Sequence, residues 1–369
     1  MFNRIINRVF PQRPPITECI ADWAKEGMPQ AVKPVRAEVQ RVLKQPCTVG
    51  PVDPAFIENQ HVHLPARMLI EIPEAVIRGK DGYVILPDGS YCLENTSEKW
   101  LRGNPAYFQR IQAKPVFLSG DYFSLMSMHC REHYHWLHDV LTSVYGLLPL
   151  LPPTTRFLVP EGTPPERIET LKAIGIDPRE VTFYDPAKPV RLERLHFAPP
   201  AAPHRFDDPE AIQWLRKRLS DHFELQPEHL LRLYVARIGT ATRRIANEEE
   251  VGSILSEYGF TMVQSEDLSL EDQARLFAQA EAIVGPHGAG LTNMLFSKSG
   301  CRVLDITAGE VDFRTYYWSL ANACDHRYFH LKGRPSTLAY DPEEFTVDLD
   351  ALIETLTAME LPRISRAKA

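Results

Sequence analysis

The stretch Ala280-Glu281-Ala282-Ile283-Val284-Gly285-Pro286-His287-Gly288-Ala289-Gly290-Leu291-Thr292-Asn293 decides the fold. A short apolar strand runs into a turn with three glycines, and the turn opens a helix that continues to Phe296. Glycines permit close backbone approach, and a helix N-terminus presents unpaired N–H groups and the positive end of its dipole. The segment therefore predicts a phosphate or diphosphate site. A turn that binds nothing is the alternative, because G-x-x-G-x-G is not the dinucleotide fingerprint and no G-K-[ST] follows.

Strands and helices alternate regularly around this stretch. Apolar runs predict strands at 231–237, 260–263, 282–285, 302–306 and 328–331, and helical periodicity predicts helices at 251–258, from Ser269, from Leu291 and around 313–318. Ser269 with Asp272 is a capping signal, and Gly259 suits a helix end. Such alternation predicts a parallel sheet whose ligands bind outside the carboxyl ends of its strands. Arg237 and the glycine turn both fall at those ends.

An earlier block repeats the alternation with different residues. The sequence predicts strands at 116–118, 156–159, 181–184 and 192–197, and helices at 132–148 and 165–174. Residues 75–95 are typical of a β-hairpin with its turn at Pro87-Asp88-Gly89-Ser90. We therefore expect an α/β protein with two α/β halves that meet near 226–229. Its expected parts are an N-terminal extension over 1–110, which contains the hairpin, a first domain over 111–227 and a second over 228–369.

Composition excludes several classes of protein. The chain has 369 residues, of which 44% are hydrophobic and 24% charged, as in soluble globular proteins. Its net charge of −7 argues against a nucleic-acid partner. Six cysteines without a C-x-x-C pair favour a reducing, cytoplasmic compartment. Residues 2–10 have amphipathic helical spacing, which fits either a helix on an anionic membrane surface or one docked on the core. No secretory signal or membrane-spanning apolar run is evident.

Three arginines join the glycine turn in this interpretation. Arg237 ends the first strand of the second half, and Arg243 and Arg244 follow a short polar loop. Guanidinium forks match phosphate oxygens in a bidentate way. An arginine at the carboxyl end of a strand, facing a glycine-rich helix start, makes a two-sided clamp for a diphosphate. The alternative is a surface loop whose arginines pair with Glu248, Glu249 and Glu250.

A second cluster of reactive side chains spans residues 129–139. His135 and Asp139 are four residues apart and share one face of a helix. A carboxylate beside an imidazole can act as a general base. Histidine and carboxylate at this spacing can also ligate zinc, but the order is not H-E-x-x-H and no third ligand is evident. A structural role for His133 and Trp136 is a further alternative.

Three motifs occur in order along the chain. They are Tyr134-His135-Trp136-Leu137-x-Asp139, then Tyr234-x-x-Arg237 with Arg243-Arg244-x-x-Asn247-Glu248, and finally Ile283-Val284-Gly285-Pro286-His287-Gly288-Ala289-Gly290-Leu291-x-Asn293. Together they resemble glycosyltransferase family 61, which includes bacterial capsular polysaccharide biosynthesis proteins and plant and animal sugar transferases. The resemblance covers about residues 115 to 310. It implies a GT-B fold of two Rossmann-like domains facing a cleft, an inverting mechanism and a nucleotide diphosphate sugar, usually a UDP-sugar.

The resemblance also implies roles for individual residues. Arg237, Arg244 and the helix start at 288–290 would hold the diphosphate in the C-terminal domain. The full set expected at the donor is Arg237, Arg243, Arg244, His287, Gly288, Ala289, Gly290, Asn293 and Glu310. Glu310 is expected at the ribose by position alone, although a solvated loop acid fits equally. Asp139 or His135 would lie near the acceptor hydroxyl as catalytic base, and His133 departs from the asparagine of many relatives.

We therefore expect an inverting hexosyl- or pentosyltransferase, cytoplasmic or membrane-peripheral, that acts on a glycan or other hydroxyl acceptor, in polysaccharide biosynthesis. A base takes the acceptor proton while arginines and helix amides stabilise the departing diphosphate. No metal is required if those groups suffice, and use of a divalent cation is left open. Asp348-Leu349-Asp350 resembles a D-x-D metal motif but more simply caps the following helix. The alternatives are a metal-dependent hydrolase built on residues 129–139 and a non-catalytic nucleotide-sugar binding protein.

Overall fold

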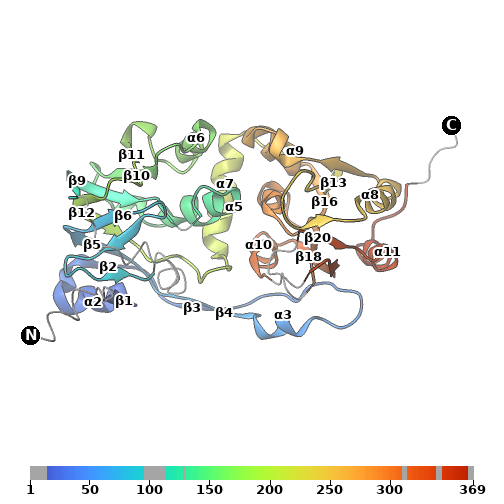
Figure 1. Ribbon diagram of the computed structural model, residues 1–369, viewed down its shortest axis with the longest axis horizontal. Helices are drawn as coiled ribbons and strands as arrows, with labels where there is room; N and C mark the ends of the chain where they lie inside the picture. Colours follow the sequence, from blue (N-terminus) through green and yellow to red (C-terminus); the bar gives the residue numbers. More distant parts are fainter. Residues whose placement is uncertain (1–14, 95–113, 128, 310–313, 338–342, 365–369) are drawn as a thin grey trace, which may run out of the picture. The chain divides into compact units, whose positions relative to one another are not determined.

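The structure, a computed structural model, describes residues 15–94, 114–127, 129–309, 314–337 and 343–364 (Figure 1). They form a mixed α/β protein, which confirms the expected α/β class. The chain divides into two compact units: Met1–Glu38 with Pro65–Ala201, and Val39–Leu64 with Ala202–Ala369. The expected division into an extension over 1–110 packed on a first domain over 111–227, and a second domain over 228–369, stays a prediction.

The described helices include none that is both long and apolar enough to cross a membrane. Residues 2–10, the predicted surface helix, lie outside the described residues.

The second unit is built on a five-stranded parallel sheet. Its strands are β13 (Leu231–Val235), β15 (Phe260–Val263), β16 (Ala280–Pro286), β17 (Arg302–Thr307) and β18 (Arg327–Lys332). They lie in the order β15-β13-β16-β17-β18, with every neighbouring pair parallel. The five strands predicted here are confirmed, with ends shifted by a few residues. Because β15 lies on one side of β13 and β16 on the other, the order of the strands reverses at β13 and β16.

Helices lie between these strands at predicted places. They are α8 (Glu248–Glu257), α9 (Leu270–Ala278) and α10 (Tyr316–Ala323). The unit also contains α11 (Leu349–Ala358), after the last strand of the sheet, and α7 (Pro209–His222), before the first, which the sequence did not predict. Ser269 caps α9 by accepting from the backbone N–H of Asp272, as predicted. Asp348 accepts from the N–H groups of Asp350 and Ala351, which confirms its capping role at α11. A small sheet of β14 (Arg244–Ile245), β20 (Glu344–Thr346) and β19 (Arg334–Pro335) completes the unit.

The helix after the glycine turn differs from expectation. It is a 3-10 helix, η8 (Ala289–Phe296), rather than an α-helix. The 3-10 form winds more tightly and is uncommon at this length. Every side chain from Leu291 to Phe296 is buried, so packing on all sides outweighs the local preference for an α-helix. Arg216 of α7 donates to the carbonyl oxygens of Leu295 and Ser297, which satisfies the end of this helix.

The first unit contains a ten-stranded mixed sheet in the order β1-β8-β7-β6-β12-β9-β10-β11, with β5 also pairing with β12 and β2 with β5. The strands are β1 (Ile16–Thr17), β2 (Val32–Arg36), β5 (Arg67–Pro73), β6 (Val76–Arg78), β7 (Tyr83–Ile85), β8 (Tyr91–Cys92), β9 (Val116–Ser124), β10 (Arg156–Pro160), β11 (Val181–Tyr184) and β12 (Val190–Phe197). Its helices include α2 (Ile20–Gly27) and α6 (Pro165–Ala173). β12, β9, β10 and β11 are mutually parallel in that order, and the four strands predicted here are confirmed.

Strands β6, β7 and β8 occupy the segment predicted to form a hairpin. β6 pairs antiparallel with β7, and β7 pairs antiparallel with β8 at Ile85 and Tyr91. Between β7 and β8, the Asp88 carboxylate accepts from the backbone N–H of Ser90. Asp88 thus folds the connection between these two strands through a local side-chain bond.

The long helix predicted over 132–148 is wrong. The segment forms a short α-turn α5 (His133–His135), a π-helix η3 (Trp136–Val140) and 3-10 turns η4 (Leu141–Val144) and η5 (Leu148–Leu150). The Thr142 hydroxyl donates to the His138 carbonyl oxygen, and the guanidinium of buried Arg67 donates to the carbonyl oxygens of Thr142 and Ser143. These bonds compete with the regular helical ladder, and the helix breaks there.

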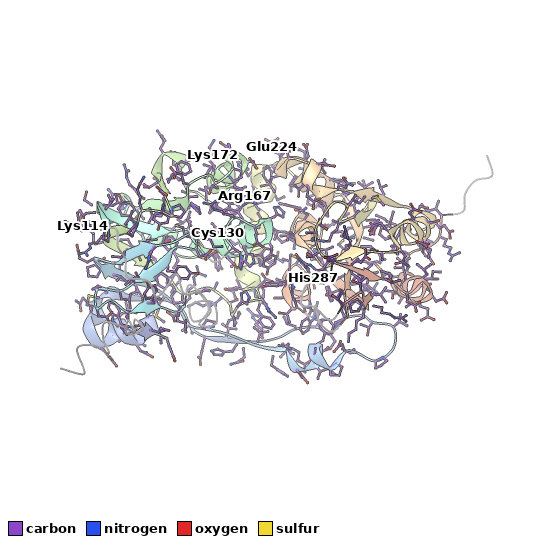
Figure 2. The ribbon with its side chains drawn as sticks, in the orientation of Figure 1. Lys114, Cys130, Arg167, Lys172, Glu224 and His287 are labelled. Atoms are coloured by element: carbon purple, nitrogen blue, oxygen red, sulfur yellow. The ribbon has the colours of Figure 1, made fainter. Side chains whose placement is uncertain are left out.

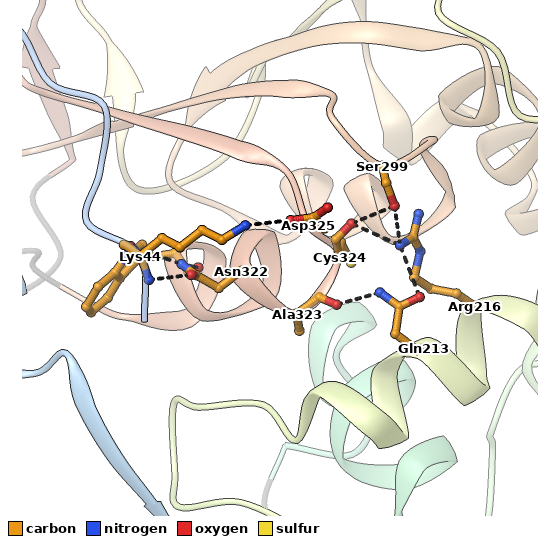
Figure 3. A network of polar contacts seen from close by, with 9 residues as sticks. Lys44, Gln213, Arg216, Ser299, Asn322, Ala323, Cys324 and Asp325 are labelled. Atoms are coloured by element: carbon orange, nitrogen blue, oxygen red, sulfur yellow. Dashed lines mark hydrogen bonds and ion pairs between the residues drawn. The ribbon is translucent and has the colours of Figure 1, made fainter. Parts of the chain in front are cut away.

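An early segment of the chain, Val39–Leu64, belongs to the second unit. It comprises β3 (Val39–Val42), α3 (Pro54–Glu58) and β4 (His61–Leu64). The backbone N–H of Lys44 donates to Asn322 Oδ1 over 2.7 Å, and its ammonium donates to Asp325 over 2.6 Å (Figure 3). Phe56 of α3 is buried with its ring edge-on to Trp318, 4.9 Å between centroids. Residues 39–64 are therefore a structural part of the unit that carries the glycine turn.

Candidate functional site

The glycine turn lies at the point where the order of the parallel strands reverses. Arg237 follows the end of β13 by two residues, and the turn follows β16 directly. β13 and β16 lie side by side in the sheet. The chain leaves β13 toward β15 on one side and leaves β16 toward β17 on the other. Ligands of open parallel sheets bind in the crevice outside the carboxyl ends at such a reversal. The topology thus supports the site that the sequence predicts.

Each glycine of the turn stands where a side chain has no room. A Cβ on Gly285 would lie 2.9 Å from the Val235 carbonyl oxygen, and one on Gly290 would lie 2.5 Å from the Val235 side chain. A Cβ on Gly288 would overlap the guanidinium of Arg237. The φ of Gly288 is 178°, an extended value that any residue adopts, so close approach rather than backbone conformation requires glycine there.

Two of the three predicted arginines reach the turn. Arg237 lies against Gly288, and Arg243 Nη1 donates to the His287 carbonyl oxygen over 2.8 Å. Arg244 lies in β14, where its guanidinium is 3.7 Å from the carboxylate of Glu344 and half-exposed. The structure therefore places Arg237 and Arg243 on the turn and Arg244 in a surface ion pair. The role that the family resemblance implies for Arg244 stays a prediction.

The residues that follow the arginine loop anchor it. Asn247 pairs through both atoms of its side-chain amide with the backbone of Val347, each bond 2.9 Å long. Tyr234 donates to Glu248 over 2.6 Å, and burial raises the pKa of Glu248. Both ends of the segment that carries Arg237 and Arg243 are thus fixed by side-chain hydrogen bonds.

A buried polar network lies under the turn. His287 Nδ1 is 2.8 Å from Asp305 Oδ2, and the Tyr328 hydroxyl donates to the same oxygen over 2.9 Å. The His287 ring also packs on Tyr317, 4.6 Å between centroids. Figure 2 labels His287 in the second unit. Sequence reasoning missed Asp305, although an acid within the apolar strand Val303-Leu304-Asp305-Ile306 is itself a signal.

The remaining predicted donor residues have different surroundings. Ala289 is the first residue of η8. Asn293 is fully buried and donates to Gln273 Oε1 over 2.7 Å, which ties η8 to α9. Glu310 lies outside the described residues. Sequence reasoning also missed Ser265, which follows β15 at the same edge of the sheet, with its hydroxyl 3.4 Å from where a Cβ on Gly290 would lie.

In the first unit, His135 and Asp139 are in contact, as their spacing predicts. His135 Nδ1 is 2.7 Å from Asp139 Oδ2, with the imidazole nine-tenths buried and the carboxylate 42% exposed. The pair spans α5 and the π-helix η3, and π-turns within helices occur frequently at functional sites. A buried imidazole bonded to an accessible carboxylate can accept a proton from a hydroxyl. The catalytic role of both residues stays a prediction.

Neighbouring side chains hold this pair in place. Trp136 donates its indole N–H to Thr170 of α6 over 3.0 Å, and Arg167 lies 5.9 Å from the centre of the Trp136 ring. His129 bonds Glu132 over 2.9 Å, and this hydrogen bond raises the pKa of His129 despite partial burial. In the part of the chain that the structure describes, no three His, Cys, Asp or Glu side chains group as metal ligands.

Comparison with known proteins bears on both segments. A comparison with curated proteins gave no match. The family model described as Glycosyltransferase 61 matches residues 133–304, a range that begins at the His135–Asp139 segment and ends beyond the glycine turn. All three motifs that carry the resemblance fall within this range. Over this range the chain is similar to glycosyltransferase family 61, and this match supports its assignment to that family.

Proposed function

We propose that this protein is an inverting glycosyltransferase of the GT-B type. It moves a hexose or pentose from a UDP-sugar to a hydroxyl of a glycan acceptor in cytoplasmic polysaccharide biosynthesis. The observation that carries the proposal is the arrangement at the strand reversal, where Arg237 and Arg243 lie on a glycine turn that opens η8. Two guanidinium groups and the N–H groups at a helix start form a site for a diphosphate rather than for an uncharged ligand.

The chemistry of transfer matches these groups. As the bond from the anomeric carbon to the diphosphate oxygen breaks, its electron pair stays on that oxygen and negative charge grows there. Arg243 is already oriented by its bond to the His287 carbonyl oxygen, so it needs little reorganisation to stabilise that charge, and Arg237 lies against the same turn at Gly288. The two arginines can supply the positive charge that other enzymes obtain from a metal ion.

Inversion requires a base that takes the proton of the acceptor hydroxyl as its oxygen attacks. Asp139 is the proposed base, because its carboxylate is accessible and its hydrogen bond to His135 fixes its orientation. His135 is the second candidate for the same role. In the proposed GT-B arrangement, the first unit carries the acceptor and the second the donor.

The test is nucleotide binding followed by turnover. Thermal unfolding of the wild type, Arg237→Ala and Arg275→Ala is measured with UDP, GDP and CMP, each with EDTA or Mg²⁺. Arg275 is a matched control, since its guanidinium is exposed and pairs with Glu271 on α9. We expect UDP to raise the Tm of the wild type and of the control by several degrees, about the effect of 2–3 kcal/mol of binding energy. We expect little UDP effect on Arg237→Ala.

Mass spectrometry of a UDP-sugar panel then separates the remaining possibilities. Transfer or slow release of UDP supports a transferase, whereas tight binding without either supports a non-catalytic binding protein. Hydrolysis that EDTA abolishes and zinc restores supports the metal-dependent hydrolase. If none of the three nucleotides stabilises the wild type, the donor-site proposal is wrong.

A further inference from the structure

Asp305 is a fully buried carboxylate on β17, the fourth strand of the five-stranded parallel sheet. Its Oδ2 accepts from His287 Nδ1 over 2.8 Å and from the Tyr328 hydroxyl over 2.9 Å. Its Oδ1 is buried and has no hydrogen-bond partner in the described part of the chain. A buried carboxylate with an unsatisfied oxygen is costly unless a positive charge faces it. Its retention under the glycine turn therefore calls for a functional explanation.

The surrounding groups show which side chain can carry that positive charge. Burial by itself raises the pKa of Asp305, but the charge and hydrogen bond of His287, with smaller effects of His330 and Tyr328, lower it overall. Burial lowers the pKa of His330 to about 4, so this imidazole is neutral at pH 7. It bonds the Thr307 hydroxyl over 2.9 Å. His287, whose Nδ1 lies 2.8 Å from Asp305 Oδ2, is thus the imidazole in direct contact with this carboxylate.

Other titratable and charged groups face this pair from every described element packed against it. Besides Asp305 on β17, they are Tyr328 and His330 on β18, Tyr316 and Tyr317 on α10, and Arg237 and Arg243 in the loop after β13. Lys332 on β18 and Asp53 before α3 act on His330 in turn. Burial raises the pKa of Tyr328 and of Tyr317, so both stay neutral and act as hydrogen-bonding groups. The two arginines oppose a third positive charge until an anion binds between them.

We propose that Asp305 is a positioning residue that holds His287 as a proton-carrying ligand of the donor diphosphate. This inference rests on the proposed function. Asp305 keeps the proton on Nδ1, so Nε2 is the ring atom left for the donor, because the bond made by one imidazole nitrogen sets the role of the other. When the diphosphate binds beside Arg237 and Arg243, its charge favours the imidazolium form, and Nε2–H donates a hydrogen bond to a diphosphate oxygen.

The transfer step stays balanced in this scheme. The bond between the anomeric carbon and the diphosphate oxygen breaks, and its electron pair remains on that oxygen. The acceptor oxygen forms the new bond to the anomeric carbon, and the acceptor proton passes to the base. His287 contributes a hydrogen bond and a positive charge to the leaving group, and no proton needs to leave it.

The first experiment determines which ring nitrogen of His287 carries the proton, and it needs no ligand. In protein labelled with ¹⁵N-histidine, the ring signals of His287 are assigned by their loss in His287→Gln. We expect a protonated Nδ1 in the wild type and in Tyr328→Phe, which removes only the other bond to Asp305 Oδ2. We expect Asp305→Asn to lose this preference. An unprotonated Nδ1 in the wild type contradicts the proposal.

The second experiment measures proton linkage with UDP-glucose, whose diphosphate does not titrate between pH 6 and 9. The Kd of the wild type should weaken as pH rises across this range by about 10- to 100-fold, the worth of one charge-assisted hydrogen bond. The pH profile of Asp305→Asn should differ from that of the wild type, since an opposite charge beside the imidazole is lost. His287→Gln, which cannot take up a proton, should give a flat profile and tests the idea even if Asp305→Asn fails to fold.

These outcomes separate the two levels of the argument. Equal pH profiles for the wild type and Asp305→Asn overturn the inference while leaving UDP-sugar binding intact. A wild type that binds no nucleotide in the thermal test overturns the proposed function, and the ¹⁵N spectra still decide whether Asp305 positions His287.

Discussion

The guanidinium of Arg237 occupies the space that a side chain at Gly288 would need. A Cβ built on Gly288 would lie 3.0 Å from Arg237 Cζ and 3.1 Å from its Cδ. The backbone at Gly288 is extended, so the glycine serves this close approach alone. A side chain from the end of β13 and a backbone segment after β16 are thus fitted to each other at the strand reversal.

Gly288→Ala should damage the donor site without damaging the fold. The obstructing atoms belong to the flexible end of Arg237, which can swing away at little cost in stability. We expect Kd for UDP to rise about 10- to 100-fold, as for loss of one charge-assisted hydrogen bond, with Tm nearly unchanged. Gly252→Ala is the control, because its Cβ would meet Met262 at an ordinary 3.6 Å. An unchanged Kd for Gly288→Ala would show that Arg237 does not hold the phosphate.

The adjacent arginines 243 and 244 should differ in effect. Arg243 donates to the His287 carbonyl oxygen, whereas Arg244 pairs with Glu344 at the surface. Calorimetry on Arg243→Ala should show at least a tenfold loss of UDP affinity, the equivalent of about 1.4 kcal/mol. Arg244→Ala should bind UDP nearly as the wild type does, since an exposed ion pair contributes about 0–1 kcal/mol. The reverse result would restore the assignment that the family resemblance implies for Arg244.

The features that were predictable from sequence are those set by local patterns. The strands of the second unit are apolar runs bounded by glycines or caps, and Ser269 marks the start of α9 by a bond to a residue three positions away. The glycine turn was likewise predictable, because three glycines in six residues indicate that other groups approach the backbone closely. These elements were predicted because their causes lie within a few residues of each other.

The features that were not predictable depend on partners distant in sequence. The helix predicted over 132–148 breaks because Arg67, some 75 residues away in the sequence, donates hydrogen bonds to the carbonyl oxygens of Thr142 and Ser143. Asp305 meets His287 across two neighbouring strands, a register that periodicity does not reveal. Arg243 and Arg244 are adjacent and chemically identical, and they differ because Arg244 pairs with Glu344 between β14 and β20 whereas Arg243 has a φ of 59°.

Asp139→Asn should separate binding from chemistry. The amide keeps the shape of the carboxylate but cannot accept the acceptor proton, and general-base catalysis contributes about 10²- to 10⁴-fold. We expect sugar transfer to fall by that factor while UDP stabilises the variant as it does the wild type. Asp177→Asn is the control, because this carboxylate is on the same unit but bonds only the start of a surface turn and Arg179. Full transfer activity in Asp139→Asn would exclude this residue as the base and leave His135.

The stability of the second unit should fall in mild acid because of buried His326. Its Nε2 donates to the Met294 carbonyl oxygen over 2.9 Å, and burial lowers its pKa to about 3. In the unfolded chain His326 takes up a proton near pH 6.5, whereas in the folded chain it stays neutral down to about pH 3. Its contribution to the free energy of unfolding is therefore complete above pH 6.5 and declines as pH falls toward 3. Between pH 6.5 and 5 the loss should be about 2 kcal/mol for this group.

Urea unfolding at pH 7.5, 6.5, 5.5 and 5.0 measures this dependence. His326→Gln removes the titrating group, so its unfolding free energy should fall less steeply with pH than that of the wild type. The slope is the decisive quantity, because the substitution itself can change stability at every pH by altering the bond to Met294. His61→Gln, at an exposed position on β4, should keep the wild-type slope. Identical slopes for His326→Gln and the wild type would mean that His326 accepts its proton in the folded protein as readily as in the unfolded chain.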